Sequence, residues 1–157
     1  MVSRWLLSAF LMFYSGIGLS DSEDCNNDES NFRCVEYVTN YDGDTITFNI
    51  PGVHPLIGKR VNIRLRGVDT PEMRSDDPCE KKLAVKARTF LAYKLQTATR
   101  IDLLNIERGK YFRIVANVKA GGRYMERALI RNSLGVPYIG GGTKPVVDWC
   151  ELLAQTE

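Results

Sequence analysis

Alternation of hydrophobic and polar residues marks five stretches of this chain. Residues 32–39 and 45–50 alternate on either side of an Asp-Gly turn, and a third alternating run spans 61–66. Alternation with period two predicts strands that bury one face, and the short turn predicts a hairpin. Further runs at 100–106 and 112–118 predict two more strands.

Helical spacing of apolar residues is clearest at 80–96, a stretch without glycine or proline. Shorter helices are expected at 125–131 and around 146–153. Three strands, a helix, two strands and a helix predict an α+β chain that is mainly β. This order is compatible with a five-stranded OB-fold barrel carrying about three helices.

The first twenty residues differ from the rest of the chain. Arg4 precedes an apolar run at 5–14, which is followed by small residues and then by acidic ones. This order predicts a signal peptide at 1–20, because a membrane-spanning helix needs ~20 apolar residues. An uncleaved anchor or a buried first helix is the alternative. After processing we expect a disulfide-pinned segment at 21–34 and one domain at 35–157, without a membrane anchor.

Four cysteines follow the expected cleavage point: Cys25, Cys34, Cys79 and Cys150. An even number in an exported chain suggests two disulfides and a secreted or periplasmic location. Of the three possible pairings we favour Cys25 with Cys34 and Cys79 with Cys150, although sequence alone does not fix the choice. The second bond would tie the region of the candidate site to the C-terminal part of the chain.

Composition and charge narrow the class of protein. With 44% hydrophobic and 25% charged residues, the chain is globular rather than disordered, collagenous or coiled-coil. Residues 21–57 carry one arginine and eight acids, whereas residues 58–157 carry nineteen lysines or arginines and eleven acids. The basic part fits a polyanionic partner. The alternative is that these charges only solvate the faces of helices and strands.

Carboxylates and an arginine gather at the ends of predicted strands. Asp44 follows the hairpin turn, Arg64 lies on the third strand, and Asp69 and Glu72 come just after it. Carboxylate oxygens favour Ca²⁺ or Mg²⁺. Phosphodiester hydrolysis needs such a cation, a base for water and donors to the phosphoryl oxygens, and arginine binds these oxygens in pairs. Gly67 interrupts the strand between Arg64 and Asp69, so their relative facing stays open.

Each motif alone also has a structural explanation. Asp-Gly is a common turn dipeptide, Arg64 could be a charge on a strand face, and Asp69 could cap a turn. His54 lies between prolines in a loop and is assigned no role.

Taken together, the motifs resemble the staphylococcal-nuclease (thermonuclease) domain in order and spacing, over about residues 35–138. They are Asp42-Gly43-Asp44-Thr45, Arg64, Asp69-Thr70-Pro71-Glu72, Tyr111-x-Arg113 and Glu126-x-Ala128-Leu129-Ile130-Arg131. The resemblance implies an OB-fold and a Ca²⁺-dependent endonuclease that cuts DNA and RNA and leaves 3′-phosphates. We expect it to act as a monomer.

The resemblance also implies a role for each matching residue. Asp44 and Asp69 would bind Ca²⁺ through carboxylates and Thr70 through its main-chain oxygen, while Glu72 would act as general base or orient the attacking water. Arg64 and Arg113 would clamp the scissile phosphate. Tyr111 and Tyr138 would form the pocket for the nucleotide.

The chain departs from the family in three places. Phe112 stands where the family often has glycine, the glycine-rich 140–142 stretch with Lys144-Pro145 replaces a longer helical C-terminus, and the cysteines are additional. A catalytically silent OB-fold module that binds nucleic acid or protein is the alternative, but such modules lack the complete set of acids and arginines. A nuclease attached to a transfer or secretion system is a third possibility.

Overall fold

Seven strands form one sheet in the part of the chain that the computed structural model describes, residues 24–110 and 113–157. The strand order is β1-β6-β7-β4-β3-β2, with β8 beside β7. All neighbours are antiparallel except β4 and β7, which run parallel. The strands are β1 (Asn31–Phe32), β2 (Glu36–Asn40), β3 (Thr45–Asn49), β4 (Val61–Leu65), β6 (Ile101–Arg108), β7 (Ile114–Ala120) and β8 (Arg123–Tyr124).

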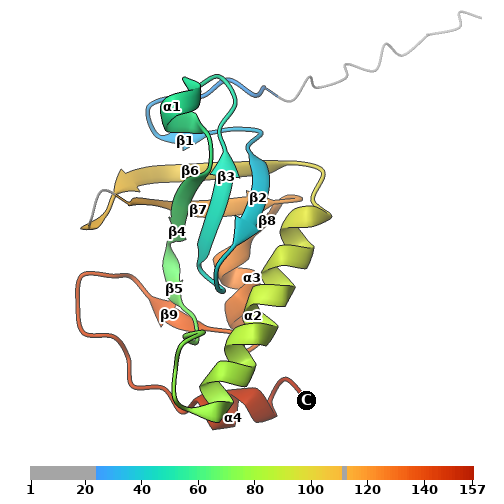
Figure 1. Cartoon of the computed structure of the whole chain (residues 1–157), viewed down its shortest axis with the longest axis vertical. Helices are drawn as coiled ribbons and strands as arrows, with labels where there is room; N and C mark the ends of the chain where they lie inside the picture. Colours follow the sequence, from blue (N-terminus) through green and yellow to red (C-terminus); the bar gives the residue numbers. More distant parts are fainter. Residues whose placement is uncertain (1–23, 111–112) are drawn as a thin grey trace, which may run out of the picture.

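Two shorter strands, β5 (Gly67–Asp69) and β9 (Val136–Tyr138), pair in a separate sheet, in which Asp69 lies opposite Val136. Figure 1 shows this pair below the large sheet. The helices are α1 (Pro55–Gly58), α2 (Pro78–Gln96), α3 (Met125–Arg131) and α4 (Trp149–Ala154).

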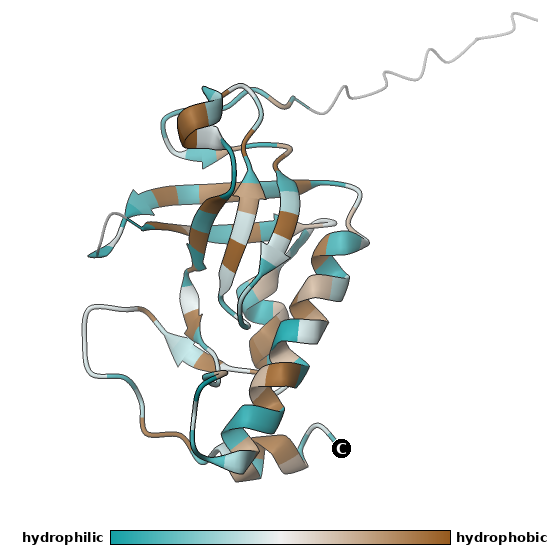
Figure 2. Cartoon of the chain, in the orientation of Figure 1, coloured by the Kyte–Doolittle hydropathy of each residue, from teal (hydrophilic) through white to brown (hydrophobic). Residues whose placement is uncertain are grey.

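The core lies between the sheet and α2. Hydrophobic residues alternate with hydrophilic ones along the strands, as the colours of Figure 2 show. On β3 the buried residues are Ile46 and Phe48, and on β4 they are Ile63 and Leu65. One face of α2 covers them with Leu83, Ala84, Ala87, Leu91 and Leu95, all buried. This burial is the main favourable contribution to folding.

Helix α2 begins where its sequence supplies a cap. The Asp77 carboxylate accepts hydrogen bonds from the backbone N–H groups of Cys79 (2.8 Å) and Glu80 (3.4 Å). Pro78 occupies the first turn, where its missing N–H costs nothing. The start of α2, and with it the end of the loop that carries Glu72, is therefore fixed by local chemistry.

The five predicted strands correspond to β2, β3, β4, β6 and β7, and the predicted helices correspond to α2, α3 and α4. The short strands β5, β8 and β9 and helix α1 were not predicted. The expected strand at 32–39 is divided into β1 and β2, because Cys34 has a φ of 51° and breaks the extended backbone.

The two ends of the strand order lie close together along the chain. β1 and β2 are at opposite ends of the sheet, yet only residues 33–35 separate them in sequence. Between them, the Val35 N–H donates to the Ile101 carbonyl at the start of β6, at 2.9 Å. The sheet must therefore curl strongly.

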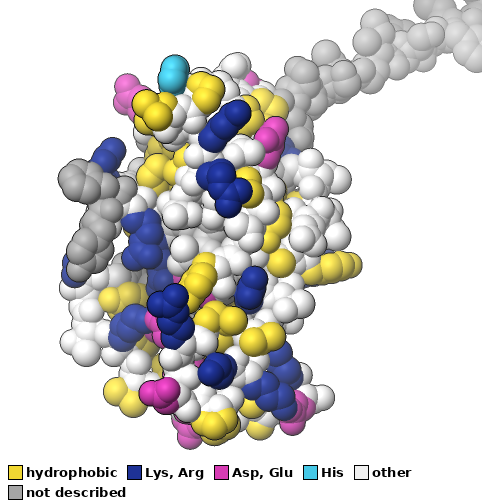
Figure 3. Space-filling view, in the orientation of Figure 1, with side chains coloured by type: hydrophobic (Ala, Val, Ile, Leu, Met, Phe, Trp, Pro, Cys, Tyr) yellow, Lys and Arg dark blue, Asp and Glu magenta, His cyan; other side chains and the backbone are white. Residues whose placement is uncertain are grey.

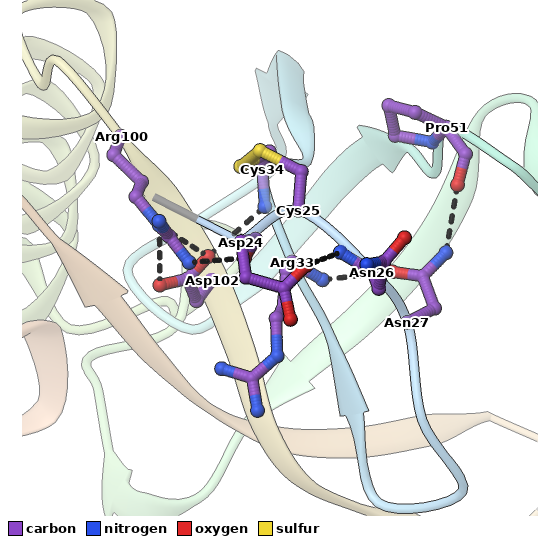
Figure 4. The surroundings of a disulfide bond; sticks show 9 residues. All are labelled: Asp24, Cys25, Asn26, Asn27, Arg33, Cys34, Pro51, Arg100 and Asp102. Atoms are coloured by element: carbon purple, nitrogen blue, oxygen red, sulfur yellow. Dashed lines mark hydrogen bonds and ion pairs between the residues drawn. A yellow bond between two sulfur atoms is a disulfide. The ribbon is translucent and has the colours of Figure 1, made fainter. Parts of the chain in front are cut away.

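A disulfide between Cys25 and Cys34 fixes the N-terminal segment, and Figure 4 shows its surroundings. The Cys34 N–H donates to the Asp102 carboxylate on β6 at 2.9 Å, and the Asn27 side chain donates to the Pro51 carbonyl at 2.7 Å. The described part of the N-terminal segment, from Asp24, is thus held by the disulfide and by hydrogen bonds at Asn27 and Cys34.

A second disulfide joins Cys79 to Cys150, so the structure has both disulfides that we favoured from the sequence. The predicted signal peptide, residues 1–20, lies outside the described residues. Within the described ranges, no helix has the length and apolar character needed to cross a membrane.

Candidate active site

The turn between β2 and β3 directs Asp44 into the protein. One Asp42 carboxylate oxygen accepts from the backbone N–H groups of Asp44 (3.0 Å) and Thr45 (2.6 Å), which closes the turn. A Cβ on Gly43 would lie 2.8 Å from the Thr70 side chain, so glycine is required there by close approach. Asp44 is 1% exposed as a result. Thr70 donates to its second oxygen through Oγ1 at 2.9 Å and through its N–H at 3.3 Å.

Arg64 joins the two aspartates that sequence analysis assigned to metal. Its guanidinium forms an ion pair with Asp44 Oδ1, and its Nη2 lies 3.3 Å from Asp69 Oδ1. The chain reaches this geometry because Gly67, the first residue of β5, has a φ of 82° and breaks the extended backbone that β4 would otherwise continue. The break leaves Arg64 and Asp69 facing each other, whereas a regular strand would have placed them on opposite faces.

Burial governs the charge of Asp44. It raises the pKa of this carboxyl group from its ordinary value of 3.8 to about 7, and the negative charges of Asp42 and Asp69 act in the same direction. The Arg64 charge and the Thr70 hydrogen bond oppose the rise. Asp44 is therefore a site where a further positive charge would be strongly favoured.

Glu72 lies on the irregular segment between β5 and α2, with its side chain 54% exposed. Its backbone N–H donates to the Glu80 carboxylate at 2.9 Å, which ties this segment to the first turn of α2. The Glu72 carboxylate itself contacts the ammonium group of Lys144 at 2.9 Å. It faces solvent and remains accessible to a water molecule, unlike Asp44 and Asp69.

Lys144 is a site residue to which the sequence analysis assigned no role. Its Nζ lies 2.9 Å from Asp69 Oδ1 and 2.9 Å from Glu72 Oε1. Burial works to lower the pKa of Lys144, but the hydrogen bonds and charges of Glu72 and Asp69 outweigh it, and the pKa is raised. The one signal in the sequence was the Lys144-Pro145 pair that follows the 140–142 glycines and Thr143, a stretch that departs from the family.

A cleft of about 1050 Å³ opens over these groups. Arg64, Glu72, Arg113 and Tyr138 line it together with Lys144, so the structure brings these four predicted residues together around one space. Asp44 and Asp69 are 1% and 3% exposed and lie beneath its surface. Figure 3 shows lysine and arginine side chains gathered on this face over β4, β5 and β9, with acidic atoms visible between them.

Two tyrosines line the cleft, and the sequence predicted only one of them. Tyr138 ends β9 and donates through its hydroxyl to the Gly142 carbonyl at 2.9 Å, so it supports the glycine-rich loop as well as the cleft wall. Tyr41 also lines the cleft, half-exposed, with the Arg74 guanidinium 5.9 Å from its ring centre, and it was not predicted. The predicted Tyr111, like Phe112, lies outside the described residues.

The donor atoms fit a calcium ion. The carboxylates of Asp44 and Asp69 converge on one guanidinium, and carboxylate and carbonyl oxygens are the ligands that Ca²⁺ prefers. Asp44, Asp69 and the Thr70 carbonyl could hold such an ion, and its charge would stabilise the ionised form of Asp44. A second cluster in the described residues, Asp77 with Cys79 and Cys150, does not fit a metal, because its cysteines form a disulfide.

An α+β fold that places two buried aspartates beside Arg64 beneath an open cleft is consistent with a nuclease-like class of protein. The family described as staphylococcal nuclease homologue matches residues 62–142, and the chain belongs to this family, which consists mostly of nucleases. The match confirms the resemblance drawn from the sequence. It begins after the turn at 42–45, so Asp44 is linked to the site by its contacts with Arg64 and Thr70. No curated protein matches the chain.

Proposed function

We propose that the protein is a Ca²⁺-dependent endonuclease that hydrolyses phosphodiester bonds of DNA and RNA and leaves 3′-phosphates. The observation that carries this proposal is the pairing of both buried aspartates with Arg64, directly beneath a cleft that Glu72 and Arg113 also line. Family membership supports the same reaction class.

Each residue has a defined part in this proposal. Asp44, Asp69 and the Thr70 carbonyl hold the calcium ion, which when bound neutralises charge that builds on the phosphoryl oxygens. Glu72 accepts a proton from the attacking water, and its exposure to solvent suits that role.

The two arginines act on the substrate. Arg64 and Arg113 donate to the nonbridging oxygens of the scissile phosphate, and Arg113 lies near the leaving group. On binding of metal and substrate, the Arg64 guanidinium exchanges part of its pairing with Asp44 and Asp69 for the phosphate. Tyr138 and Tyr111 contribute to the nucleotide pocket, and base stacking on tyrosine is worth about 1–3 kcal/mol per base.

We also infer that the curled sheet is a closed OB-fold barrel. The short connection from β1 to β2 and the hydrogen bond between Val35 and Ile101 support closure. In this fold, loops at one face of the barrel bind nucleic acid.

The protein is inferred to be exported, with residues 1–20 as its signal peptide, and to act as a monomer in the periplasm or outside the cell. Its two disulfides support an oxidising location.

Cleavage of plasmid DNA and of RNA by the oxidised mature chain tests the proposal, with Ca²⁺, with Mg²⁺ and with EGTA. We expect cleavage in Ca²⁺ that EGTA abolishes, and products with 3′-phosphates. A folded protein that binds nucleic acid but cuts neither substrate with either ion would instead support a silent binding module.

A further inference from the structure

The Lys144 ammonium occupies the acidic cluster of the site. It lies 2.9 Å from Asp69 Oδ1, and the same oxygen also faces Arg64 Nη2 at 3.3 Å. Its second partner is Glu72 Oε1, at 2.9 Å. One cationic side chain therefore joins a proposed metal ligand to the proposed general base.

The stretch that carries Lys144 is attached to the strand that carries Asp69. β9 pairs with β5 in a register that sets Val136 opposite Asp69 and Tyr138 opposite Gly67. The Tyr138 hydroxyl then donates to the Gly142 carbonyl at 2.9 Å, which draws the glycine-rich turn back toward β9. Positive φ angles at Gly140 and Gly141, 80° and 79°, allow the chain to make that turn.

The other end of this stretch is attached to the helix that follows Glu72. Cys150, on α4, is joined by a disulfide to Cys79 in the first turn of α2. Residues 67–79 and 136–150 thus run between two fixed connections, a strand pairing at one end and a covalent bond at the other. Lys144 bridges them in the middle. We call residues 136–150 the clipped loop.

We propose that Lys144 is a built-in counter-ion of the metal site, which a divalent cation must displace from Asp69. This inference rests on the assignment of Asp69 as a metal ligand in the proposed function. Asp69 Oδ1 cannot keep its contact with the ammonium at full strength while it coordinates a dication, because the two positive groups would repel each other at contact distance. The clipped loop therefore lowers the calcium affinity of the site.

Displacement does not require the clipped loop to unfold. The Lys144 side chain is 50% exposed and flexible, and it lines the cleft, so its ammonium can turn from Asp69 into solvent or stay with Glu72. The backbone of the loop is held elsewhere, by β9 and by the disulfide. Affinity for calcium is thus set by a side-chain contact on a fixed scaffold.

Calcium titration by calorimetry, with nucleic acid absent, compares the oxidised wild type with Lys144→Met. We expect the calcium dissociation constant of the variant to fall about fivefold or more, since a positive charge next to a ligand oxygen is removed. Lys59→Met is the matched control, because Lys59 is an exposed lysine directly after α1, at the opposite end of the molecule in Figure 1. It should stay within about twofold of wild type, as distant surface charges are screened.

The outcomes separate this inference from the proposed function. Calcium binding of equal affinity in wild type and Lys144→Met, or weaker binding in the variant, overturns the counter-ion role and leaves the metal site intact. Absence of calcium binding in both proteins overturns the metal assignment and the inference with it.

Lysine acylation read by mass spectrometry gives a second measurement on the wild type. Without calcium, Lys144 should react more slowly than Lys59, because its ammonium is paired with two carboxylates. With saturating calcium its rate should rise toward that of Lys59. A Lys144 rate that calcium leaves unchanged contradicts displacement.

Discussion

Asp44 is the most deeply buried of the three proposed metal-binding residues. It is 1% exposed, yet the proposed function needs it as a charged metal ligand. Its raised pKa means that the calcium-free folded protein holds a proton that the unfolded chain releases at much lower pH. Proton binding and folding are consequently linked through one carboxyl group, and under the proposed function metal binding is linked to both.

The pH dependence of calcium-free stability follows from this linkage. The folded pKa of about 7 exceeds the ordinary 3.8, so Asp44 contributes stability that is present below pH 3.8 and is lost as pH rises through about 7. Denaturant unfolding in EGTA should show this loss in the wild type but not in Asp44→Asn. Equal pH dependence in the two proteins would contradict the assignment. Calcium affinity should rise over the same window, because fewer protons compete for the carboxylate.

Glu72 offers the clearest test of catalysis at the residue scale. Because its side chain is 54% exposed, Glu72→Gln should leave the melting temperature nearly unchanged while lowering kcat by about 100-fold or more, through loss of the base. Glu107→Gln is the control, since Glu107 lines the same cleft and its side chain is 67% exposed. Near-normal kcat in Glu72→Gln, with Glu107→Gln equally active, would remove Glu72 from the mechanism.

Single residues also show how far the site could be predicted. Asp44, Arg64, Asp69 and Glu72 stand in short motifs, so the sequence singled them out before any geometry was known. Lys144 did not stand out, because its partner Glu72 is 72 positions away and no local pattern records an ion pair at that distance.

At the scale of elements, the turn before β3 is fixed by contact with a distant segment. Gly43 approaches Thr70 and Ala87 so closely that an added Cβ would lie 2.8 Å from Thr70 Cγ2 and 3.0 Å from the Ala87 Cβ. The turn therefore packs at Gly43 against Thr70 and α2 together, and Asp44 is held beside Thr70. A turn of this type is part of the core and not a free surface loop.

Gly43→Ala should lower the free energy of unfolding by about 1–3 kcal/mol, because overpacking forces the neighbours apart. Calcium affinity should fall with it, as Asp44 moves relative to Thr70. Gly142→Ala is a suitable comparison, since nothing lies within 4 Å of the new Cβ and no positive φ is involved. Urea denaturation measures the free energy of unfolding of both variants. A Gly43→Ala variant as stable as Gly142→Ala would show that the turn is looser than described.

The length of a helix or strand determines whether the sequence pattern could predict it. The 19-residue helix α2 and the strands of five to eight residues have enough positions to show a period. β5 and β9 have three residues each, too few for alternation to be recognised, and only their mutual pairing defines them. Helix α1, four residues in a stretch with flanking prolines, is likewise too short to show a helical period, so its sequence predicts a loop.

At the scale of the whole molecule, the two disulfides join cysteines that lie at very different separations along the sequence. Cys25 and Cys34 are 9 positions apart, whereas Cys79 and Cys150 are 71 apart and enclose β6, β7 and β8 of the large sheet. A cross-link that closes a longer loop removes more conformational entropy from the unfolded chain. The two bonds should therefore contribute unequally to stability.

Replacing Cys79 and Cys150 by alanine should lower the free energy of unfolding by about 4 kcal/mol, against about 2.5 kcal/mol for Cys25 and Cys34, in the loop-entropy relation. Guanidinium unfolding of the two double variants, with the wild type under oxidising conditions, makes the comparison. A larger loss from the Cys25 and Cys34 pair would mean that the N-terminal segment carries packing energy beyond its loop closure.

The covalent tie between α2 and α4 also has a consequence for the order of maturation. Cys150 is synthesised long after Cys79, and the two can join only where an oxidant reaches both. Until then, nothing covalent holds the far end of the stretch that presents Lys144 to Asp69 and Glu72. A newly made, reduced chain therefore holds Lys144 against the carboxylates of Asp69 and Glu72 less firmly than the oxidised protein does. The compartment in which the disulfide forms thus affects how completely the negative charge of the site is neutralised.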